Sequence, residues 1–185
     1  MNLLFLYGSP GVGKMTVSKY ISNITGWTDF HLHHTIDYVR SIFPREIEGS
    51  EELVDDFSLK MINFASRNDI DLIYTYVYAR EADDYFIRHL IKLSKKNNIN
   101  IFFVNLVCDF DQNITRIKDK KRNNFKKIIS VKKFKDLHKK YDLLSSISYV
   151  NNLVVETTNQ TEKQTADFIV KKLSIKCQKQ KNKKK

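Results

Sequence analysis

A glycine-rich segment near the start of the chain has the residue types and the spacing that phosphate binding requires. Its residues, in order, are Gly8, Ser9, Pro10, Gly11, Val12, Gly13, Lys14, Met15 and Thr16. The glycines let the backbone curl closely around an anion, with several N–H groups pointing inward, and Lys14 adds a positive charge for the β- and γ-phosphates of a nucleotide. The segment therefore predicts a nucleotide-binding loop.

The segments on either side of this loop are those that should hold it in place. Residues Asn2–Tyr7 are apolar and predict a strand. A helix is predicted from about Lys14 to Ile24, because apolar residues recur at helical spacing on one side, namely Val17, Tyr20, Ile21 and Ile24. The positive end of that helix would then face the bound phosphates.

Two positions where Mg²⁺ ligands are common carry other residues in this sequence. The residue after the loop lysine is Met15, and the hydroxyl of Thr16 comes one position later. The predicted strand Leu72–Tyr78 lacks a carboxylate at its carboxyl end, because Asp69 and Asp71 precede it. A thioether is a poor ligand for Mg²⁺. We therefore expect the ion to be held through water, through the phosphates or by a carboxylate elsewhere, with Thr16 as the candidate metal ligand of the loop.

A second group of chemically capable side chains follows the predicted strand Thr28–Leu32. The group consists of His31, His33, His34 and Asp37. Ligands of open α/β sheets bind at the carboxyl ends of the strands, so we expect these residues to face a second substrate. Asp37 lies one helical turn after His33 and His34 and is the first candidate to position or deprotonate a hydroxyl, with His33 as the second.

Arginines near the same edge add candidate contacts to that substrate. Arg40 lies in a helix that is predicted to end near Pro44, and Arg80 follows the strand Leu72–Tyr78 together with Glu81. Both arginines are predicted to bind the second substrate. Metal binding by the neighbouring histidines lacks a third ligand at a plausible spacing.

Positive charge is concentrated in the second half of the chain. Residues 1–90 hold eight Lys and Arg against 13 Asp and Glu, whereas residues 91–185 hold 24 against eight. Residues 116–140 alone carry 12 basic side chains and two acidic ones. This segment follows the predicted strand Ile99–Cys108. Its Arg116 and Arg122 are the candidates for a phosphate clamp, because a guanidinium binds phosphate through two parallel hydrogen bonds.

Length and composition indicate one globular domain. The chain has 185 residues, of which 42% are hydrophobic, and it contains only five Gly and two Pro. The longest apolar run, Ile101–Cys108, is much shorter than the roughly 20 residues of a membrane helix, and Met1–Tyr7 lacks the basic start of a secretory signal. Cys108 and Cys177 form no disulfide or zinc-binding pattern. We therefore expect a cytoplasmic protein.

Apolar strands that alternate with helices predict a doubly wound α/β domain over residues 1–175. We expect a five-stranded parallel sheet with helices on both faces. The remaining predicted elements are the strands Ile99–Cys108 and Leu153–Glu156, the helices Glu51–Arg67 (capped by Ser50), Ala82–Lys96 and Glu162–Ser174, and a basic helix-turn-helix over about 111–141. Residues 176–185 are rich in lysine and are predicted to form a disordered, basic tail.

Over roughly residues 1–175 the chain resembles the small P-loop kinases of the nucleoside-monophosphate-kinase and shikimate-kinase type, in particular uncharacterised bacterial proteins described as shikimate-kinase-like. The residues that carry the resemblance are the loop through Thr16, which is similar to that of adenylate kinases, the run Phe30–His33 ahead of Ile36 and Asp37, the segment Ile73–Ala79, and Arg116 with Arg122. The resemblance implies a three-layer P-loop NTPase fold, a helical lid over about 111–141, and Mg²⁺-dependent transfer of a phosphoryl group from ATP to a small molecule. It also implies that the adenine base lies near Thr157–Thr161.

Phosphorylation of a small-molecule acceptor is the leading hypothesis. The catalytic candidates are Lys14, Asp37, Arg116 and Arg122. A nucleoside or nucleotide kinase remains an alternative, since Arg40 and Arg45 could bind an acceptor phosphate. The basic second half leaves open a less favoured role on nucleic acid, and Met15 leaves open a nucleotide sensor with weak catalysis. No membrane partner is expected, and the chain is predicted to be a monomer or a homodimer.

Overall fold

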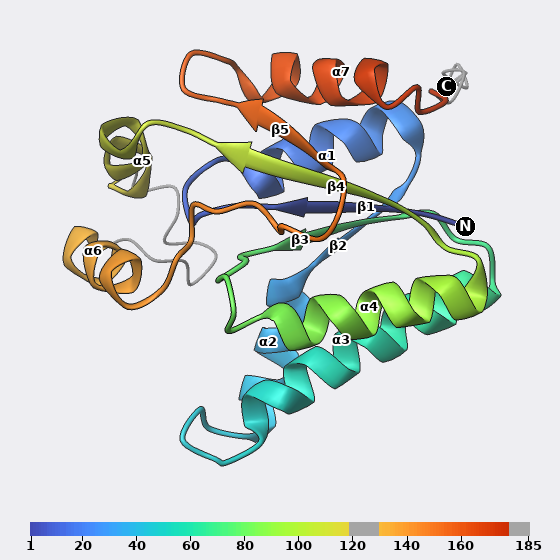
Figure 1. Cartoon of the computed structure of the whole chain (residues 1–185), viewed down its shortest axis with the longest axis horizontal. Helices are drawn as coiled ribbons and strands as arrows, with labels where there is room; N and C mark the ends of the chain where they lie inside the picture. Colours follow the sequence, from blue (N-terminus) through green and yellow to red (C-terminus); the bar gives the residue numbers. More distant parts are fainter. Residues whose placement is uncertain (119–129, 178–185) are drawn as a thin grey trace, which may run out of the picture.

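Five strands form one parallel sheet at the centre of the structure (Figure 1). They are β1 (Asn2–Tyr7), β2 (Thr28–His31), β3 (Leu72–Tyr76), β4 (Asn100–Val107) and β5 (Asn152–Glu156). Their order across the sheet is β2-β3-β1-β4-β5. The computed structural model describes residues 1–118 and 130–177 of the chain. Because the strands are parallel, all five carboxyl ends lie along one edge, and the predicted five-stranded parallel sheet is confirmed.

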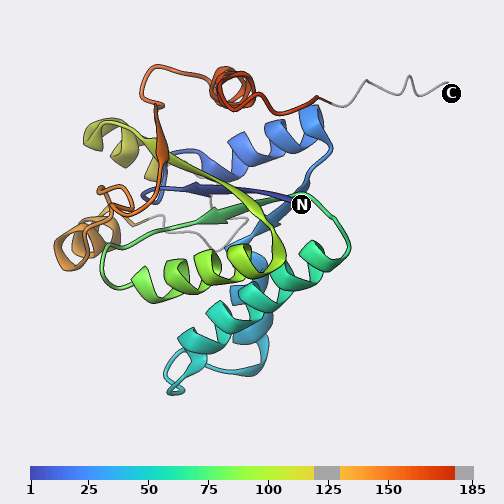
Figure 2. The same cartoon turned by 45° about the vertical axis from the view of Figure 1, so that its right-hand side comes forward.

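Helices cover both faces of this sheet. They are α1 (Lys14–Thr25), α2 (Leu32–Ile42), α3 (Ser50–Arg67), α4 (Asp84–Asn97), α5 (Phe110–Ile117), α6 (Val131–Lys140) and α7 (Glu162–Lys172). Figures 1 and 2 show α1 and α7 on one face, α3 and α4 on the other, and α5 and α6 beyond the carboxyl ends of the strands. None of the helices within residues 1–118 and 130–177 has the length and apolar character needed to cross a membrane.

The two faces of the sheet bury different kinds of side chain. The face toward α3 and α4 is rich in aromatic residues, namely Phe5, Tyr7, Tyr74, Tyr76 and Phe103, and Phe86 of α4 packs against them. The face toward α1 and α7 is aliphatic and includes Leu4, Leu6, Ile73, Val104 and Leu106. Successive residues of a strand point to opposite faces, so a strand that is buried on both faces must be apolar along its whole length. This explains the uninterrupted apolar sequence of β1.

The register of the central strands brings distant segments to the end of β1. Tyr7, the last residue of β1, pairs with Tyr76 on one side and with Asn105 on the other. In the next strand pair, His31 lies opposite Thr75. The ends of β2 and β3 therefore lie beside the point where the glycine-rich loop begins.

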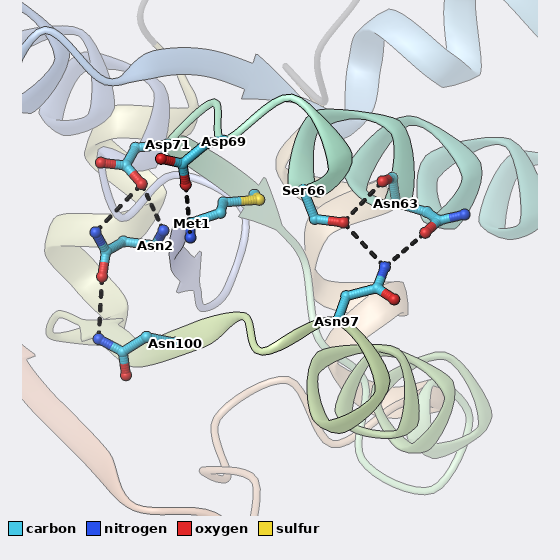
Figure 3. A network of polar contacts seen from close by, with 8 residues as sticks. All are labelled: Met1, Asn2, Asn63, Ser66, Asp69, Asp71, Asn97 and Asn100. Carbon is cyan, nitrogen blue, oxygen red and sulfur yellow. Dashed lines mark hydrogen bonds and ion pairs between the residues drawn. The ribbon is translucent and has the colours of Figure 1, made fainter.

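The opposite, amino edge of the sheet is held by polar contacts (Figure 3). Asp71 Oδ1 accepts hydrogen bonds from the backbone N–H and the side-chain amide of Asn2, which fixes the start of β1 to the start of β3. The Asn97 amide donates to Asn63 Oδ1 (2.6 Å) and to the Ser66 hydroxyl (2.9 Å), and this joins α4 to α3. Asp71 thus lies at the edge away from the loop, as the sequence order predicted.

The predicted cap of α3 is wrong. Ser50 is the first residue of the helix, and Gly49 takes the N-cap position with φ 76°. The Ser50 hydroxyl instead donates to the Arg45 carbonyl oxygen (3.2 Å) and accepts a hydrogen bond from Arg40 (2.8 Å). The left-handed turn at Gly49 brings Ser50 into the helix, because glycine adopts a positive φ without steric cost. β3 also ends two residues earlier than predicted.

Candidate active site

The phosphate loop lies at the carboxyl edge of the sheet, between β1 and α1. Gly8 (φ 139°) and Gly11 (φ 95°) adopt backbone conformations that other residues rarely reach. A Cβ atom at Gly8 would come within 2.2 Å of the Leu106 carbonyl oxygen, and one at Gly11 within 2.1 Å of Asn113 Oδ1. Gly8 therefore requires glycine for lack of space as well as for its backbone angles, because the overlap is with backbone. At Gly11 the overlap is with the end of a side chain, and the positive φ is the stronger constraint.

The lysine of the loop folds back over the loop backbone. Lys14 Nζ donates hydrogen bonds to the carbonyl oxygens of Gly8 (2.7 Å) and Ser9 (2.9 Å). Gly13 occupies the N-cap position of α1 and makes no side-chain cap. The first N–H groups and the positive end of α1 are therefore directed to the loop, where a polyphosphate can accept hydrogen bonds from them.

Side chains from α5 and α6 contact the loop on its outer side. The Ser9 hydroxyl lies 2.9 Å from His138 Nε2 of α6 and 3.4 Å from Asn113 Nδ2 of α5. The His138 ring packs against Phe134 and Phe110, and these contacts join the two helices. Burial lowers the pKa of His138, which favours the neutral imidazole. Sequence reasoning missed Asn113 and His138, because they lie 104 and 129 positions from Ser9 and carry no motif.

Arg116 lies on α5 beside the segment that follows β5. Its guanidinium donates to the hydroxyl (3.0 Å) and to the carbonyl oxygen (2.6 Å) of Thr157. Thr157 is fixed to the end of β4, because its backbone N–H donates to the Val107 carbonyl oxygen (2.8 Å). Arg116 thus adjoins the segment Thr157–Thr161. Arg122, the second predicted clamp residue, lies outside the described residues.

His31 links β2 to β3 through a buried chain of polar contacts. Its Nε2 atom lies 2.9 Å from Asp29 Oδ2, and its Nδ1 atom lies 3.0 Å from Thr75 Oγ1. Only 3% of His31 is exposed. Since both ring nitrogens already have partners, the side chain fixes the orientation of Thr75 beside β1. Asp29 Oδ1 is buried without a hydrogen-bond partner.

The other predicted acceptor residues lie on α2. Asp37 is exposed and His33 is half-buried, whereas Thr35 and Val39 on the inner side of the helix are buried. Thr35 accepts a hydrogen bond from the Ser58 hydroxyl (3.1 Å), which attaches α2 to α3. Asp37 is therefore carried by a helix that is anchored on its opposite side.

Two carboxyl groups and two tyrosines gather at the carboxyl end of β3, and we call Asp55, Asp83, Tyr74 and Tyr76 the acidic–tyrosine cluster. Asp83 Oδ2 accepts a hydrogen bond from the Ala79 N–H (2.6 Å) and interacts with the Tyr76 hydroxyl. Burial, followed by the charge of Asp83, raises the pKa of Asp55 to about 7. Burial also raises the pKa of Asp83 to about 6, against the effect of the bond from Ala79. No motif marked this cluster, because its members lie on three different elements.

The arginines that were predicted near the second substrate contact acidic side chains. Arg40 Nη2 lies 2.7 Å from Glu51 Oε1, and Arg45 Nε lies 2.8 Å from the same oxygen. The Arg80 guanidinium lies 3.9 Å from Asp142 Oδ2 and lines an open hollow of about 340 Å³ between the loop after β3 and the end of α6. All three positive charges are thus balanced locally.

The region around the loop offers few metal ligands. Thr16 is exposed in the first turn of α1, and Met15 beside it is half-buried. Within the part of the chain that the structure describes, no three His, Cys, Asp or Glu side chains form a group that could hold a metal ion. A loop of this kind can receive a polyphosphate through its backbone and Lys14. Of its two hydroxyls, that of Ser9 is buried against His138 and that of Thr16 is exposed to a cation.

Comparison with solved structures assigns the fold. A sugar kinase from Janibacter sp. HTCC2649 matches with a TM-score of 0.68 at 12% identity, over 95% of this chain and 95% of its own. A shikimate kinase from Acinetobacter baumannii, in complex with shikimate, matches with a TM-score of 0.60 at 18% identity, over 99% of this chain and 95% of its own. This chain has the fold of the shikimate- and gluconate-type P-loop kinases.

A gluconokinase from Sinorhizobium meliloti extends the P-loop kinase likeness, with a TM-score of 0.61 and 12% identity over 94% of this chain and 91% of its own. No family model matches the sequence, and a search of the curated proteins finds no match. At these identities the likeness concerns the fold. The chemistry of this P-loop kinase fold must therefore be argued from its own side chains.

Gly11→Ala should abolish tight nucleotide binding and lower the free energy of unfolding by roughly 1–3 kcal/mol, because the added Cβ overlaps Asn113. Gly49→Ala is the matched control, since Gly49 also has a positive φ but a Cβ there meets no atom within 4 Å. Calorimetric titration with ATP and unfolding in urea measure the two effects. Equal losses of ATP affinity in both variants would contradict a steric role for Gly11.

The acidic–tyrosine cluster should make the free energy of unfolding depend on pH. The pKa values of Asp55 and Asp83 rise from 3.8 to about 7 and about 6 on folding, so the folded chain binds more protons between these limits. The stabilising, protonated form is complete below about pH 4, and its contribution is lost as the pH rises through 6 and 7. Unfolding in urea at pH 5 and at pH 8 measures this loss.

Asp55→Asn should make the free energy of unfolding fall less between pH 5 and pH 8. The expected difference from the wild type is roughly 1–3 kcal/mol after allowance for partial exposure to solvent. The control is Asp167→Asn, which changes an exposed carboxylate on α7, over the other face of the sheet. A pH dependence that persists unchanged when Asp55 and Asp83 are both replaced by Asn would exclude the cluster as its source.

Proposed function

We propose that the protein is an ATP-dependent phosphotransferase that phosphorylates a small-molecule acceptor. The observation that carries this proposal is the loop at the end of β1, where Lys14, the uncapped start of α1 and the glycine backbone converge. The P-loop kinases with the same fold, which include a sugar kinase and a shikimate kinase, support a small molecule as the acceptor.

The loop residues 8–16 would hold the phosphates of ATP. Arg116, which is bonded to Thr157, adjoins the segment Thr157–Thr161, where we propose that the adenine base binds. We propose that Mg²⁺ arrives with the nucleotide, held by phosphate oxygens and water, with Thr16 as its contact from the protein. When bound, the ion neutralises part of the charge of the phosphates.

Phosphoryl transfer requires little covalent chemistry from a protein, and positioning and positive charge account for most of the catalysis. In our proposal the acceptor hydroxyl attacks the γ-phosphorus, its proton passes to Asp37, and ADP leaves. Lys14, Arg116 and Arg122 stabilise the charge on the transferred group. His31, His33, Arg40 and Arg80 complete the acceptor side, His31 through its contact with Thr75.

A nucleotide acceptor is less well supported. Its phosphate would need a pair of available arginines, and Arg40 and Arg45 both contact Glu51. A role on nucleic acid has no support from the described residues beyond the positive charge of the second half of the chain.

Lys14→Ala should weaken ATP binding by roughly tenfold to a hundredfold and abolish turnover, because the ammonium is the loop's charged donor to the phosphates. Lys19→Ala, on the same helix but at an exposed position, is the control. Calorimetry with ATP in the presence of Mg²⁺ measures the affinity. Unchanged ATP binding in Lys14→Ala would contradict the assignment of residues 8–16 as the phosphate-binding loop and would overturn the proposed function.

Asp37→Asn should leave ATP affinity intact and lower the rate of phosphoryl transfer by roughly 10²- to 10⁴-fold, as expected for the loss of a general base. ADP release is measured with an acceptor identified by screening nucleosides, sugars, shikimate-like acids and aminoglycosides. Glu46→Gln, an exposed carboxylate beyond α2, serves as the control. Full activity in Asp37→Asn would show that another group receives the proton.

A further inference from the structure

We propose that the acceptor carries a protonated amino group, which binds to the carboxylates of Asp55 and Asp83 and the hydroxyl of Tyr74 at the carboxyl end of β3. The inference rests on the proposed phosphotransferase function and names the class of acceptor. That class is an amino alcohol or amino sugar, in which one molecule carries both the hydroxyl to be phosphorylated and the ammonium group.

The acidic–tyrosine cluster lies beside the phosphate loop. Tyr76 is the last residue of β3 and pairs in register with Tyr7, which directly precedes Gly8. The Tyr76 ring stacks on Phe86 of α4, with 4.9 Å between the ring centroids, so it belongs to the face covered by α3 and α4. Asp83 is the N-cap residue of α4 at the same edge. A molecule bound to this cluster would adjoin the loop that holds the γ-phosphate.

The charges around the two carboxylates are acidic. Those that act most strongly on Asp55 come from Asp83, Glu51, Asp56 and Glu52. Four nearby arginines have other partners. Arg40 and Arg45 contact Glu51, Arg80 lies near Asp142, and the Arg88 guanidinium lies 4.8 Å from the centroid of the Tyr149 ring. A carboxylate or a phosphate on the acceptor would be repelled by these acidic side chains, whereas an ammonium group would be attracted to them.

The Tyr74 hydroxyl is a second and independent indication of a ligand. Tyr74 is 0% exposed, and its hydroxyl has no partner at hydrogen-bond geometry. Burial raises the pKa of Tyr74, an interaction with the nearby Ser58 hydroxyl lowers it, and the charge of Asp55 raises it. The Ser58 hydroxyl directs its own proton to the Val54 carbonyl oxygen (2.9 Å) and to Thr35 (3.1 Å), so it does not donate to Tyr74. A buried polar group without a partner is costly, and a ligand that supplies an N–H donor removes that cost.

The aromatic surroundings favour an ammonium group over a metal ion. The rings of Tyr74 and Tyr76 lie 6.1 Å and 4.9 Å from that of Phe86, and aromatic rings attract organic cations. A divalent cation prefers a larger set of oxygen ligands, and the described chain brings together no three His, Cys, Asp or Glu side chains that suit one. The two carboxylates and the Tyr74 hydroxyl match the three donors of an ammonium group, while the Tyr76 hydroxyl is bonded to Asp83 and holds that carboxylate in place.

The test compares acceptors that differ in a single group. The full chain is titrated by calorimetry with D-glucosamine, D-glucose and D-gluconate, each with and without a non-hydrolysable ATP analogue, and ADP release from ATP is followed with each compound. Ethanolamine, ethylene glycol and glycolate form a second series. We expect the amine of each series to bind roughly tenfold more tightly than its neutral and anionic counterparts, because charge-assisted hydrogen bonds form with the amine alone.

Variants locate the binding site. Asp55→Asn and Asp83→Asn keep the size of the side chain and remove its charge, and each should weaken amine binding by roughly tenfold to a hundredfold. Tyr74→Phe should weaken it severalfold. In all three variants the affinity for the ATP analogue should stay unchanged. Asp167→Asn, which changes an exposed carboxylate on α7 over the other face of the sheet, should bind the amines as the wild type does.

Each outcome separates this inference from the proposed function. A wild-type protein that binds the ATP analogue but binds the amines no more tightly than their neutral counterparts would overturn the inference and leave the phosphotransferase standing. So would Asp55→Asn or Asp83→Asn variants with reduced kcat and unchanged KM, because the pair would then act as a general base. Failure to bind the analogue would overturn the proposed function, while the titrations without nucleotide would still measure the preference for an amine.

Discussion

The backbone of the phosphate loop approaches the backbone of β4 so closely at Gly8 that no side chain fits between them, because a Cβ there would meet the carbonyl oxygen of Leu106. This approach follows from the parallel pairing of β1 with β4, which runs along the whole of β1 and ends beside the loop. At Gly11 the loop instead meets side chains of α5, namely Asn113 and Ile117. The same helix carries Arg116, which contacts Thr157, so the loop, α5 and the segment after β5 pack together.

The two faces of the sheet contribute different chemistry to its carboxyl edge. The aliphatic face supports α1, whose uncapped start and Lys14 supply donors for phosphates. The aromatic face ends in Tyr76 and is continued by Asp83, so that polar groups lie at the rim of an apolar core. Low polarity beneath these groups, more than any single partner, raises the pKa values of Asp55 and Asp83.

Charge is also divided between the two sides of the loop. Basic residues dominate α6, the His138 side chain of which contacts Ser9, whereas acidic residues dominate the first half of α3. Arg40 and Arg45 add little positive charge to the acidic side, since both contact the Glu51 carboxylate. An anionic donor and a cationic acceptor would each be attracted to its own side. The net charge of +11 alone conceals this arrangement, because it sums two regions of opposite sign.

The sequence by itself determined the five strands, the order of helices between them, and the loop with Lys14, because each depends on neighbouring residues with a regular period or a fixed spacing. It misplaced the cap of α3, where the left-handed turn at Gly49 moves Ser50 into the helix. Only the tertiary structure brought His138 and Asn113 to Ser9, and Asp55 to Asp83, since these groups come from distant segments. Their chemistry arises from burial and proximity, which the register of the sheet and the packing of its helices create, and no local pattern encodes either.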